Sequence, residues 1–372
     1  MLVPSSTAKL YILRVFARFL GLSLFIFTAL LLMLNFVQII NKGVLAGFSF
    51  YFLTKSMLCL LPNIVATSLP LAFLLAMLLS LGDMSQDGEI IALRAGGFSF
   101  YDILSGVLWA AVLAVLFLLA VNNWAGPKSL KRSTDYTVLM LNRVTKIDLK
   151  PHTFQQISDW VLYADGVNNL KGTMRGVKLF RRINKSDAAA FVTKINAAEG
   201  RYDVLRERGL QIELGSGQFS QTDCKAPKKI LYGNFQSYRT LLPFFSEGGP
   251  GRKLNQREIS TPGLLARLKA GMEDPEAATK YRIEVATRFA LALAPLAFFL
   301  VGAPLGVALD KRGRSAGFAI TLVIIFFYYG LTITGSVLAR KYPVLFPWAI
   351  FVPALATALA GVWLWKRRLY AK

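Results

Sequence analysis

Long apolar runs and short polar segments alternate along most of the chain, and six of the runs are long enough to cross a bilayer. A helical span needs ~20 mostly apolar residues. The six runs lie at 19–40, 58–81, 103–121, 289–309, 316–337 and 346–365. None of them has an Asp, Glu, Lys or Arg well inside it, and such a charge at the bilayer centre costs ~2.5–3.5 kcal/mol. The pattern therefore predicts an α-helical transmembrane bundle of six spans.

The interval between the third and fourth spans has a different period. From about residue 152 to residue 240, short alternating stretches are separated by turn-forming residues, among them Asp165-Gly166, Asn184, Gly200, Gly209 and Pro227. This spacing is typical of antiparallel strands, so we expect an inserted all-β domain, a jelly roll or sandwich. The predicted strands lie near 154, at 160–163, 174–180, 189–195, 201–205, 210–219 and 230–238.

Three regions follow from these two patterns. Residues 1–123 form a transmembrane half with spans one to three and a connecting helix at 82–98, and residues 124–258 form the β-domain. Residues 259–372 hold a connecting helix and spans four to six. Thr261-Pro262 and Asp274-Pro275 each resemble a helix N-cap followed by proline. We expect the second of these helices to run unbroken into the fourth span.

Charge gives the orientation. The chain has 372 residues, 54% of them hydrophobic, with 43 Lys and Arg against 21 Asp and Glu. The excess of basic residues has two possible explanations, binding to nucleic acid or membrane topology, because Lys and Arg also mark the cytoplasmic loops of membrane proteins. The side that holds both termini has eleven bases in its short segments, and the other side has four: Lys42, Lys55, Arg340 and Lys341. Both termini are therefore predicted to be cytoplasmic, with the β-domain outside and no nucleic-acid partner.

Enzyme signatures are missing from the sequence. Two cysteines and one histidine exclude a cysteine-rich metal site and an HExxH metalloprotease, and no GxSxG nucleophile motif occurs. The chain also lacks the GxxxxGK[ST] loop that binds nucleotide phosphates. We therefore expect a non-catalytic subunit that binds no cofactor, with ATP and Mg²⁺ used by a partner if transport is driven by ATP.

The loop between the second and third spans carries the most information. It reads LGDMSQDGEIIALRAGGFS over 81–99. Ser85 is a plausible cap for a surface helix that presents acids to the cytoplasm, with Ile90, Leu93 and Arg94 on one face. A partner ATPase could push on such a helix. A plain solvated connector is the alternative.

Polar residues also gather at the outer end of the first span. Asn35, Gln38, Asn41 and Lys42 share roughly one face of a helix. That face lines either a wet cavity or another protein surface, because polar groups avoid lipid.

The loop at 81–99, the NNWAGP run after the third span and the DKRGRSAGF run entering the fifth resemble the lipopolysaccharide export permeases, the LptF/LptG family. The resemblance covers the whole chain. It implies an ABC transporter subunit in the inner membrane of a Gram-negative bacterium that extracts lipopolysaccharide and passes it to a periplasmic bridge. The implied partners are a homologous six-span permease, a cytoplasmic ATPase dimer and a single-span periplasmic protein. NNWAGP and two stretches at 154–156 and 234–238 are more similar to the F type.

The resemblance also implies roles for individual residues. Glu89 matches the glutamate of the family's coupling helix, which docks on the ATPase. The implied coupling residues are Asp87, Glu89, Ile90, Leu93 and Arg94. Lys42 matches the basic residues that meet lipid A phosphates, with Asn35 and Gln38 beside it. Family members often carry further bases one or two turns earlier, where this chain has Asn35 and Gln38.

Two other functions compete with transport. One is a membrane-bound enzyme that modifies envelope lipid or glycan with its outer domain, and the other is a structural or signalling subunit. Loss of ATPase binding and of lipid export on substitution of Glu89 would distinguish a transporter from a structural or signalling subunit. Hydrolysis of an envelope lipid or glycan by the purified protein without an ATPase would support the enzyme.

Overall fold

A computed structural model describes most of the chain. The described residues are 6–43, 50–142, 149–157, 160–184, 190–205, 209–223, 230–242, 254–271, 275–308, 313–342 and 345–369. They divide into two compact units. One comprises Met1–Asn35, Cys59–Arg132 and Asn255–Lys372, and the other comprises Phe36–Leu58 and Ser133–Leu254.

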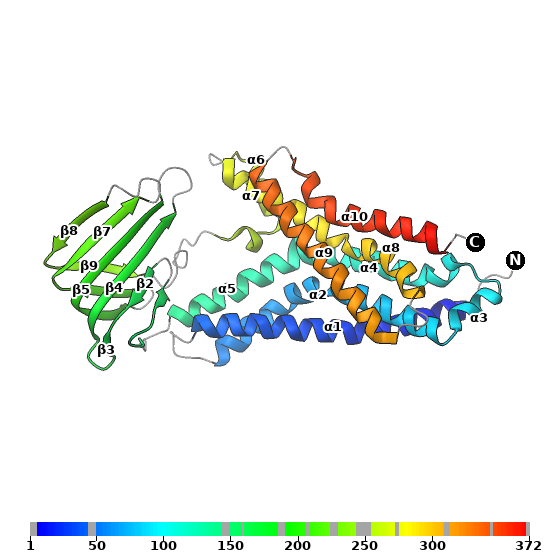
Figure 1. Cartoon of the computed structure of the whole chain (residues 1–372), viewed down its shortest axis with the longest axis horizontal. Helices are drawn as coiled ribbons and strands as arrows, with labels where there is room; N and C mark the ends of the chain where they lie inside the picture. Colours follow the sequence, from blue (N-terminus) through cyan, green and yellow to red (C-terminus); the bar gives the residue numbers. More distant parts are fainter. Residues whose placement is uncertain are drawn as a thin grey trace. The chain divides into compact units, whose positions relative to one another are not determined.

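Helices dominate both ends of the chain (Figure 1). Within the described ranges, six helical segments are long and apolar enough to cross a membrane, as predicted: Thr7–Ile40, Leu53–Gln86, Phe100–Thr137, Pro275–Val307, Ala316–Lys341 and Trp348–Arg367. The helices are α1 (Ser6–Gly43), α2 (Phe50–Gln86), α3 (Glu89–Ala95), α4 (Phe100–Ala120), α5 (Gly126–Asn142), α6 (Thr261–Lys269), α7 (Pro275–Ala292), α8 (Ala294–Val307), α9 (Gly313–Lys341) and α10 (Trp348–Leu364). The described residues also form the π-helices η2 (Val121–Ala125) and η5 (Trp365–Leu369) and the 3₁₀-helix η3 (Gln256–Glu258).

Helix α2 is the centre of the membrane bundle. Its residues 71–78 are all buried, and Phe73 packs edge-on against Phe16 of α1 with ring centroids 5.1 Å apart. Helix α8 approaches α2 closely through Gly302 and Gly306, which are four residues apart. A β-carbon at Gly306 would lie only 2.8 Å from Leu81 Cβ. Small residues at this spacing allow two helices to pack backbone to backbone in lipid, where apolar burial gives no driving force.

The third and fourth spans differ from their predicted form. Helix α4 does not end at NNWAGP, because the chain continues through the π-turn η2 into α5, so the predicted boundary at 123/124 falls inside a helical segment. The predicted continuous helix from 275 is interrupted at Leu293, next to Pro295. Proline has no N–H to donate and crowds the carbonyl four residues earlier, which breaks the regular helix. Asp274 lies outside the described residues.

The inserted region is one antiparallel sheet, which confirms the predicted all-β domain. Its strands are β1 (Gln155–Ile157), β2 (Trp160–Tyr163), β3 (Gly166–Asn168), β4 (Thr173–Asn184), β5 (Ala190–Leu205), β6 (Gly209–Leu214), β7 (Gly217–Asp223), β8 (Ile230–Phe235) and β9 (Tyr238–Leu242). The order is β1-β2-β4-β5-β6-β9, with β3 on β4 and the pair β7-β8 on β5. Two predicted strands, 189–195 and 201–205, are the single strand β5, and the predicted strand 210–219 is divided between β6 and β7.

The long strands β4 and β5 change the side that faces the core at the same level. In β4 the even-numbered Met174 is buried before Gly176, and the odd-numbered Val177 and Leu179 are buried after it. In β5 the odd-numbered Ile195 and Ala197 are buried first, and then the even-numbered Gly200. On its other edge β5 pairs with β7 over 191–197 and with β6 over 200–205. One hydrogen-bonded sheet therefore bends into two halves that share one apolar core.

Gly176 makes the bend possible, and its replacement provides a test. Its φ is +61°, and a β-carbon there would overlap the Asp165 carboxylate. We expect Gly176→Ala to destabilise the β-domain by at least ~1–2 kcal/mol, the cost of a left-handed backbone for an L-residue. The measurement is the temperature at which the β-domain of the detergent-solubilised chain becomes sensitive to protease. Gly166→Ala is the control, because its β-carbon would meet only Arg175 Cβ at 3.9 Å. Equal temperatures for both variants would contradict this account of the bend.

Candidate coupling site

The short helix α3 is set between two glycines with positive φ. Helix α2 ends at Gln86, and Gly88, at φ +72°, reverses the chain so that α3 starts at Glu89. After α3, Gly97 has a φ of +88°, and its N–H donates to the Arg94 carbonyl at 3.0 Å. The predicted Ser85 cap is wrong. Ser85 lies in the last turn of α2, and its hydroxyl donates to the Val307 carbonyl of α8 at 2.8 Å.

Helix α3 turns one isoleucine inward and the next outward. Ile90 is 2% exposed and belongs to the same apolar cluster as Ile12 and Phe16 of α1, and Leu93 packs against that cluster. Ile91 is 66% exposed. Ile90 and Leu93 were predicted beside Glu89 as coupling residues, and the structure places both against the bundle. They attach α3 to the membrane helices, while Ile91 is part of the surface open to a partner.

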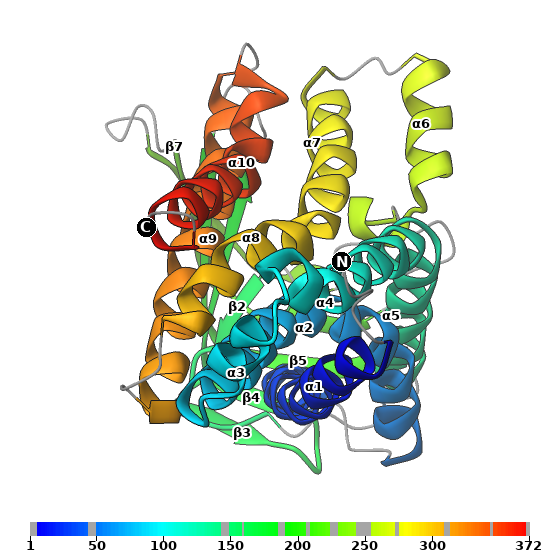
Figure 2. The same ribbon diagram turned by 90° about the vertical axis from the view of Figure 1, so that its right-hand side faces the viewer.

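The charged residues of this loop have distinct environments. Glu89 Oε1 accepts a hydrogen bond of 2.8 Å from the Tyr11 hydroxyl of α1, so α3 lies beside the first turns of α1 (Figure 2). Glu89 Oε2 is enclosed and has no hydrogen-bond partner among the described residues. Asp87 is exposed, and the Arg94 guanidinium lies 4.2 Å from the centroid of the Phe100 ring. The carboxylate of Glu89 thus keeps an acceptor oxygen that none of the described residues uses.

The candidate substrate residues lie along the far part of α1. The Asn35 side chain donates to the Leu31 carbonyl of its own helix at 2.8 Å, and Gln38 is exposed. Lys42 belongs to α1, but its side chain lies outside the described residues. Steps of three and four residues place all three positions on one side of the helix.

Two buried polar clusters were not predicted. In the first, the Ser56 hydroxyl of α2 lies 2.9 Å from the Ser133 hydroxyl and 3.1 Å from the Thr137 hydroxyl of α5. Ser56 and Ser133 are buried. The signal available in the sequence was the spacing of Ser133 and Thr137, which are four residues apart and so share one face of the polar helix α5.

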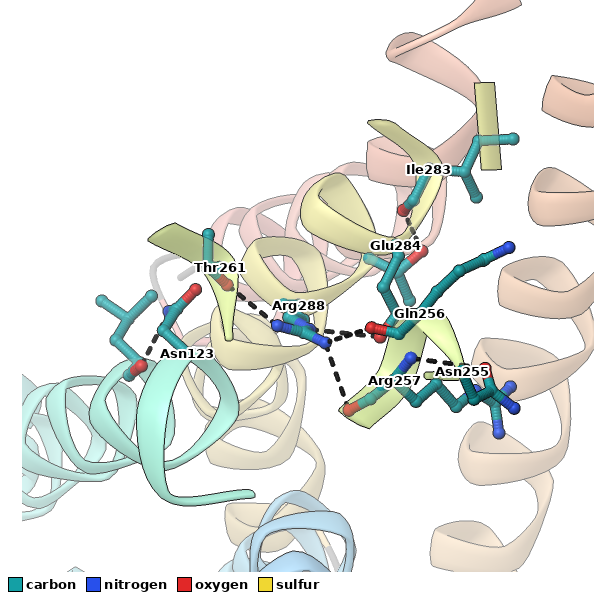
Figure 3. Close-up of polar contacts among 10 residues, drawn as sticks. Asn123, Asn255, Gln256, Arg257, Thr261, Ile283, Glu284 and Arg288 are labelled. Atoms are coloured by element: carbon teal, nitrogen blue, oxygen red, sulfur yellow. Dashed lines mark hydrogen bonds and ion pairs between the residues drawn. The ribbon is translucent and has the colours of Figure 1, made fainter. Parts of the chain in front are cut away.

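The second cluster centres on Arg288 of α7 (Figure 3). Its Nε lies 3.1 Å from Glu284 Oε1, and its Nη1 donates to the Thr261 hydroxyl at 3.1 Å. Its Nη2 donates to the carbonyls of Gln256 and Arg257 at 3.2 and 3.4 Å. The signal available in the sequence was the Glu284–Arg288 spacing of four residues, directly before the predicted start of the fourth span.

The β-domain carries a hollow of about 430 Å³. Charged side chains are prominent in its lining, which includes Arg175, Glu199, Arg201 and Glu213. Such a lining suits a polar ligand better than an acyl chain.

Comparison with known proteins identifies the family. A model of the "Lipopolysaccharide export system permease LptF/LptG" family matches residues 10–367. The chain belongs to the LptF/LptG family. The LptG permease proteins of Escherichia coli K12 and of Escherichia coli O6:H1 are each 25% identical to it over 133 residues. That match covers 36% of this chain and 37% of each relative.

Family membership confirms the predicted fold class, and the six apolar helical segments among the described residues fit the prediction of a multi-pass membrane protein. The LptF/LptG model includes both types, and the two relatives named above are of the G type. The assignment to the F type stays a prediction. Within the described residues, no group of three or more His, Cys, Asp or Glu could hold a metal ion.

The contrast between Ile90 and Ile91 tests the orientation of α3. Removing a fully buried isoleucine side chain costs about 2–5 kcal/mol, whereas an exposed site changes by roughly 0.5 kcal/mol or less. We expect Ile90→Ala to lower the thermal unfolding midpoint of the purified chain clearly and Ile91→Ala to leave it nearly unchanged. Equal shifts for the two variants would show that α3 is oriented differently.

Proposed function

We propose that this chain is the permease subunit of an ATP-driven exporter. It extracts lipopolysaccharide from the inner membrane and passes it to a periplasmic bridge, while a partner ATPase hydrolyses ATP with Mg²⁺. The family match over 10–367 supports the transport role. The sequence has no nucleotide-binding loop of its own, which supports a separate motor protein. The subunit itself binds no cofactor and catalyses no reaction in this proposal.

The observation that carries the coupling role is the geometry of α3. Ile90 and Leu93 attach this helix to the bundle, while Asp87, Ile91 and Arg94 are exposed. Glu89 keeps one carboxylate oxygen without a hydrogen-bond partner in the part of the chain that the structure describes. An Arg or Lys of the ATPase is the natural group for that oxygen, since charge-assisted hydrogen bonds to carboxylates are the stronger kind. Reaching Oε2 requires a small movement of Glu89, because this oxygen is enclosed.

The substrate side follows from the far part of α1. Lipopolysaccharide is an anionic amphiphile, and transfer of each buried CH₂ costs ~0.8 kcal/mol. In this proposal Lys42, with Asn35 and Gln38 on the same side of α1, meets the phosphates of the headgroup. Apolar faces of α1 and α9 are well exposed, with Phe25 at 73% and Phe326 at 75%. The acyl chains and a homologous six-span permease are the proposed occupants of these faces.

The β-domain provides a surface for a periplasmic partner. Strand β8 pairs with β7 alone among the described strands, so its second edge has no strand beside it. It contains no charged residue or proline, and its Leu231 and Tyr232 are strongly exposed. Edges of this kind accept a further strand. We propose that a single-span periplasmic protein or the bridge itself supplies that strand.

Substitution of Glu89 tests the coupling role. Because a lysine in its place would repel a basic partner group, we expect Glu89→Lys to reduce copurification of the cytoplasmic ATPase roughly tenfold or more, the effect of losing one charge-assisted hydrogen bond. Glu276→Lys, an acid at the start of α7, is the control. Copurified ATPase is measured against permease after mild detergent extraction. Unchanged ATPase binding and unchanged lipopolysaccharide export in Glu89→Lys would refute the coupling role.

The orientation has a separate test. In a background in which both cysteines are replaced, we expect Ile91→Cys to react with a membrane-impermeant maleimide in inside-out vesicles and not in intact spheroplasts. Leu170→Cys, at a β-domain position that is 96% exposed, is the opposite control and should react in spheroplasts. Reversal of this pattern would place α3 on the wrong side of the membrane for an ATPase.

A further inference from the structure

A polar junction joins η2, which lies inside the third span, to the segment that returns from the β-domain. The outgoing chain leaves α4 through η2, and the returning chain enters through η3 and α6. The turn η2 packs against α6 and α7. Its Asn123 is 6% exposed, and the side-chain oxygen of this residue has no hydrogen-bond partner among the described residues. We call this region, comprising η2, residues 255–261 and the Glu284–Arg288 turn of α7, the junction.

Arg288 holds the returning chain within the junction. It is 6% exposed, and the Thr261 hydroxyl and two backbone carbonyls that it binds all belong to residues 256–261 (Figure 3). Glu284 balances its charge from one turn earlier on α7. Only the planar fork of arginine can donate in these directions at once, since lysine has a single ammonium group.

The opposite end of the same span is attached to the coupling loop. Gly302 and Gly306 of α8 allow close contact with Met77 and Leu81 of α2. The Ser85 hydroxyl bonds the Val307 carbonyl at the point where α2 ends, four residues before Glu89. Packing this tight leaves no space into which one helix could shift alone.

The interruption between α7 and α8 does not separate the two ends. Only Leu293 lies between the helices, and its N–H donates to the Phe289 carbonyl at 3.2 Å. The Ala297 N–H in turn donates to the Leu293 carbonyl at 3.3 Å. Backbone hydrogen bonds of helical spacing thus run through the bend, so the span transmits displacement along its axis.

We infer that the fourth span links the coupling helix mechanically to the root of the β-domain, and that Arg288 is the positioning residue that fastens the returning segment to it. This inference rests on the proposed function. Movement of α3 by an ATPase shifts α2 and α8 together, and α7 then moves η3 and α6 through Arg288. Without this fastening, ATP would still be hydrolysed, but its energy would not reach the β-domain.

The test is the number of lipopolysaccharide molecules released per ATP hydrolysed by the full complex in nanodiscs. We expect Arg288→Met to reduce this ratio roughly tenfold or more, the factor for one lost hydrogen bond to a charged group, while ATP hydrolysis and the yield of complex stay near wild type. A damaged fold would lower the yield and hydrolysis together, so the ratio distinguishes positioning from structure. Arg282→Met, an exposed arginine of the same helix, is the control and should leave the ratio unchanged.

A spin label at Lys269, an exposed position in the last turn of α6, reports the fastening directly. We expect the label to become more mobile in Arg288→Met. If that variant does not accumulate, Thr261→Val decides the matter, because it removes one of the hydrogen bonds and keeps the charge pair. An unchanged ratio and unchanged mobility would overturn the inference. If the wild-type complex contains no ATPase or releases no lipopolysaccharide with ATP, the proposed function fails instead.

Discussion

The close contact between α2 and α8 is the constraint on which the membrane part depends. In lipid, helices associate through dispersion contacts and hydrogen bonds, because the surrounding acyl chains are as apolar as leucine. Gly302 and Gly306 provide that contact, and side chains of any size there would push α8 away from Met77 and Leu81. The same approach brings the Val307 carbonyl within reach of Ser85 and so determines where α2 ends. The position of α3, and with it Glu89, follows from a pair of glycines more than 200 residues away.

Spans and strands differ in how well the sequence predicts them. The six spans were predicted because burial of a charge in lipid is costly, and few sequences avoid charge over such lengths by chance. The strands were harder, because glycine was interpreted as a break. Gly200 lies inside β5, where the Leu214 side chain occupies the space that a β-carbon would need. A glycine that ends a strand and a glycine that makes room for a neighbour look alike in sequence.

The sequence predicted only part of the candidate site. The acidic loop stood out as a short polar helix between two spans, whereas Glu89 was predicted from the resemblance of residues 81–99 to the LptF/LptG family. Seven residues are too few for a periodicity to show which isoleucine is buried, so Ile90 and Ile91 could be told apart only in the folded chain. Tyr11 and Glu89 are 78 residues apart, and Arg288 meets its backbone acceptors about 30 residues away. Hydrogen bonds to carbonyls leave no trace in side-chain patterns.

Strand β5 has a consequence for the biogenesis of the domain. One edge of β5 pairs with β4. On the other edge, the first half of β5 pairs with β7, although β6 comes between β5 and β7 in the sequence. A nascent chain that has been synthesised only as far as Leu214 can pair β4 with β5 and β6 with the second half of β5, yet residues 191–197 still present bare backbone. Such an edge invites pairing with a neighbouring chain. The domain is therefore most exposed to misassembly in the interval before residues 217–223 emerge, when the covering strand does not yet exist.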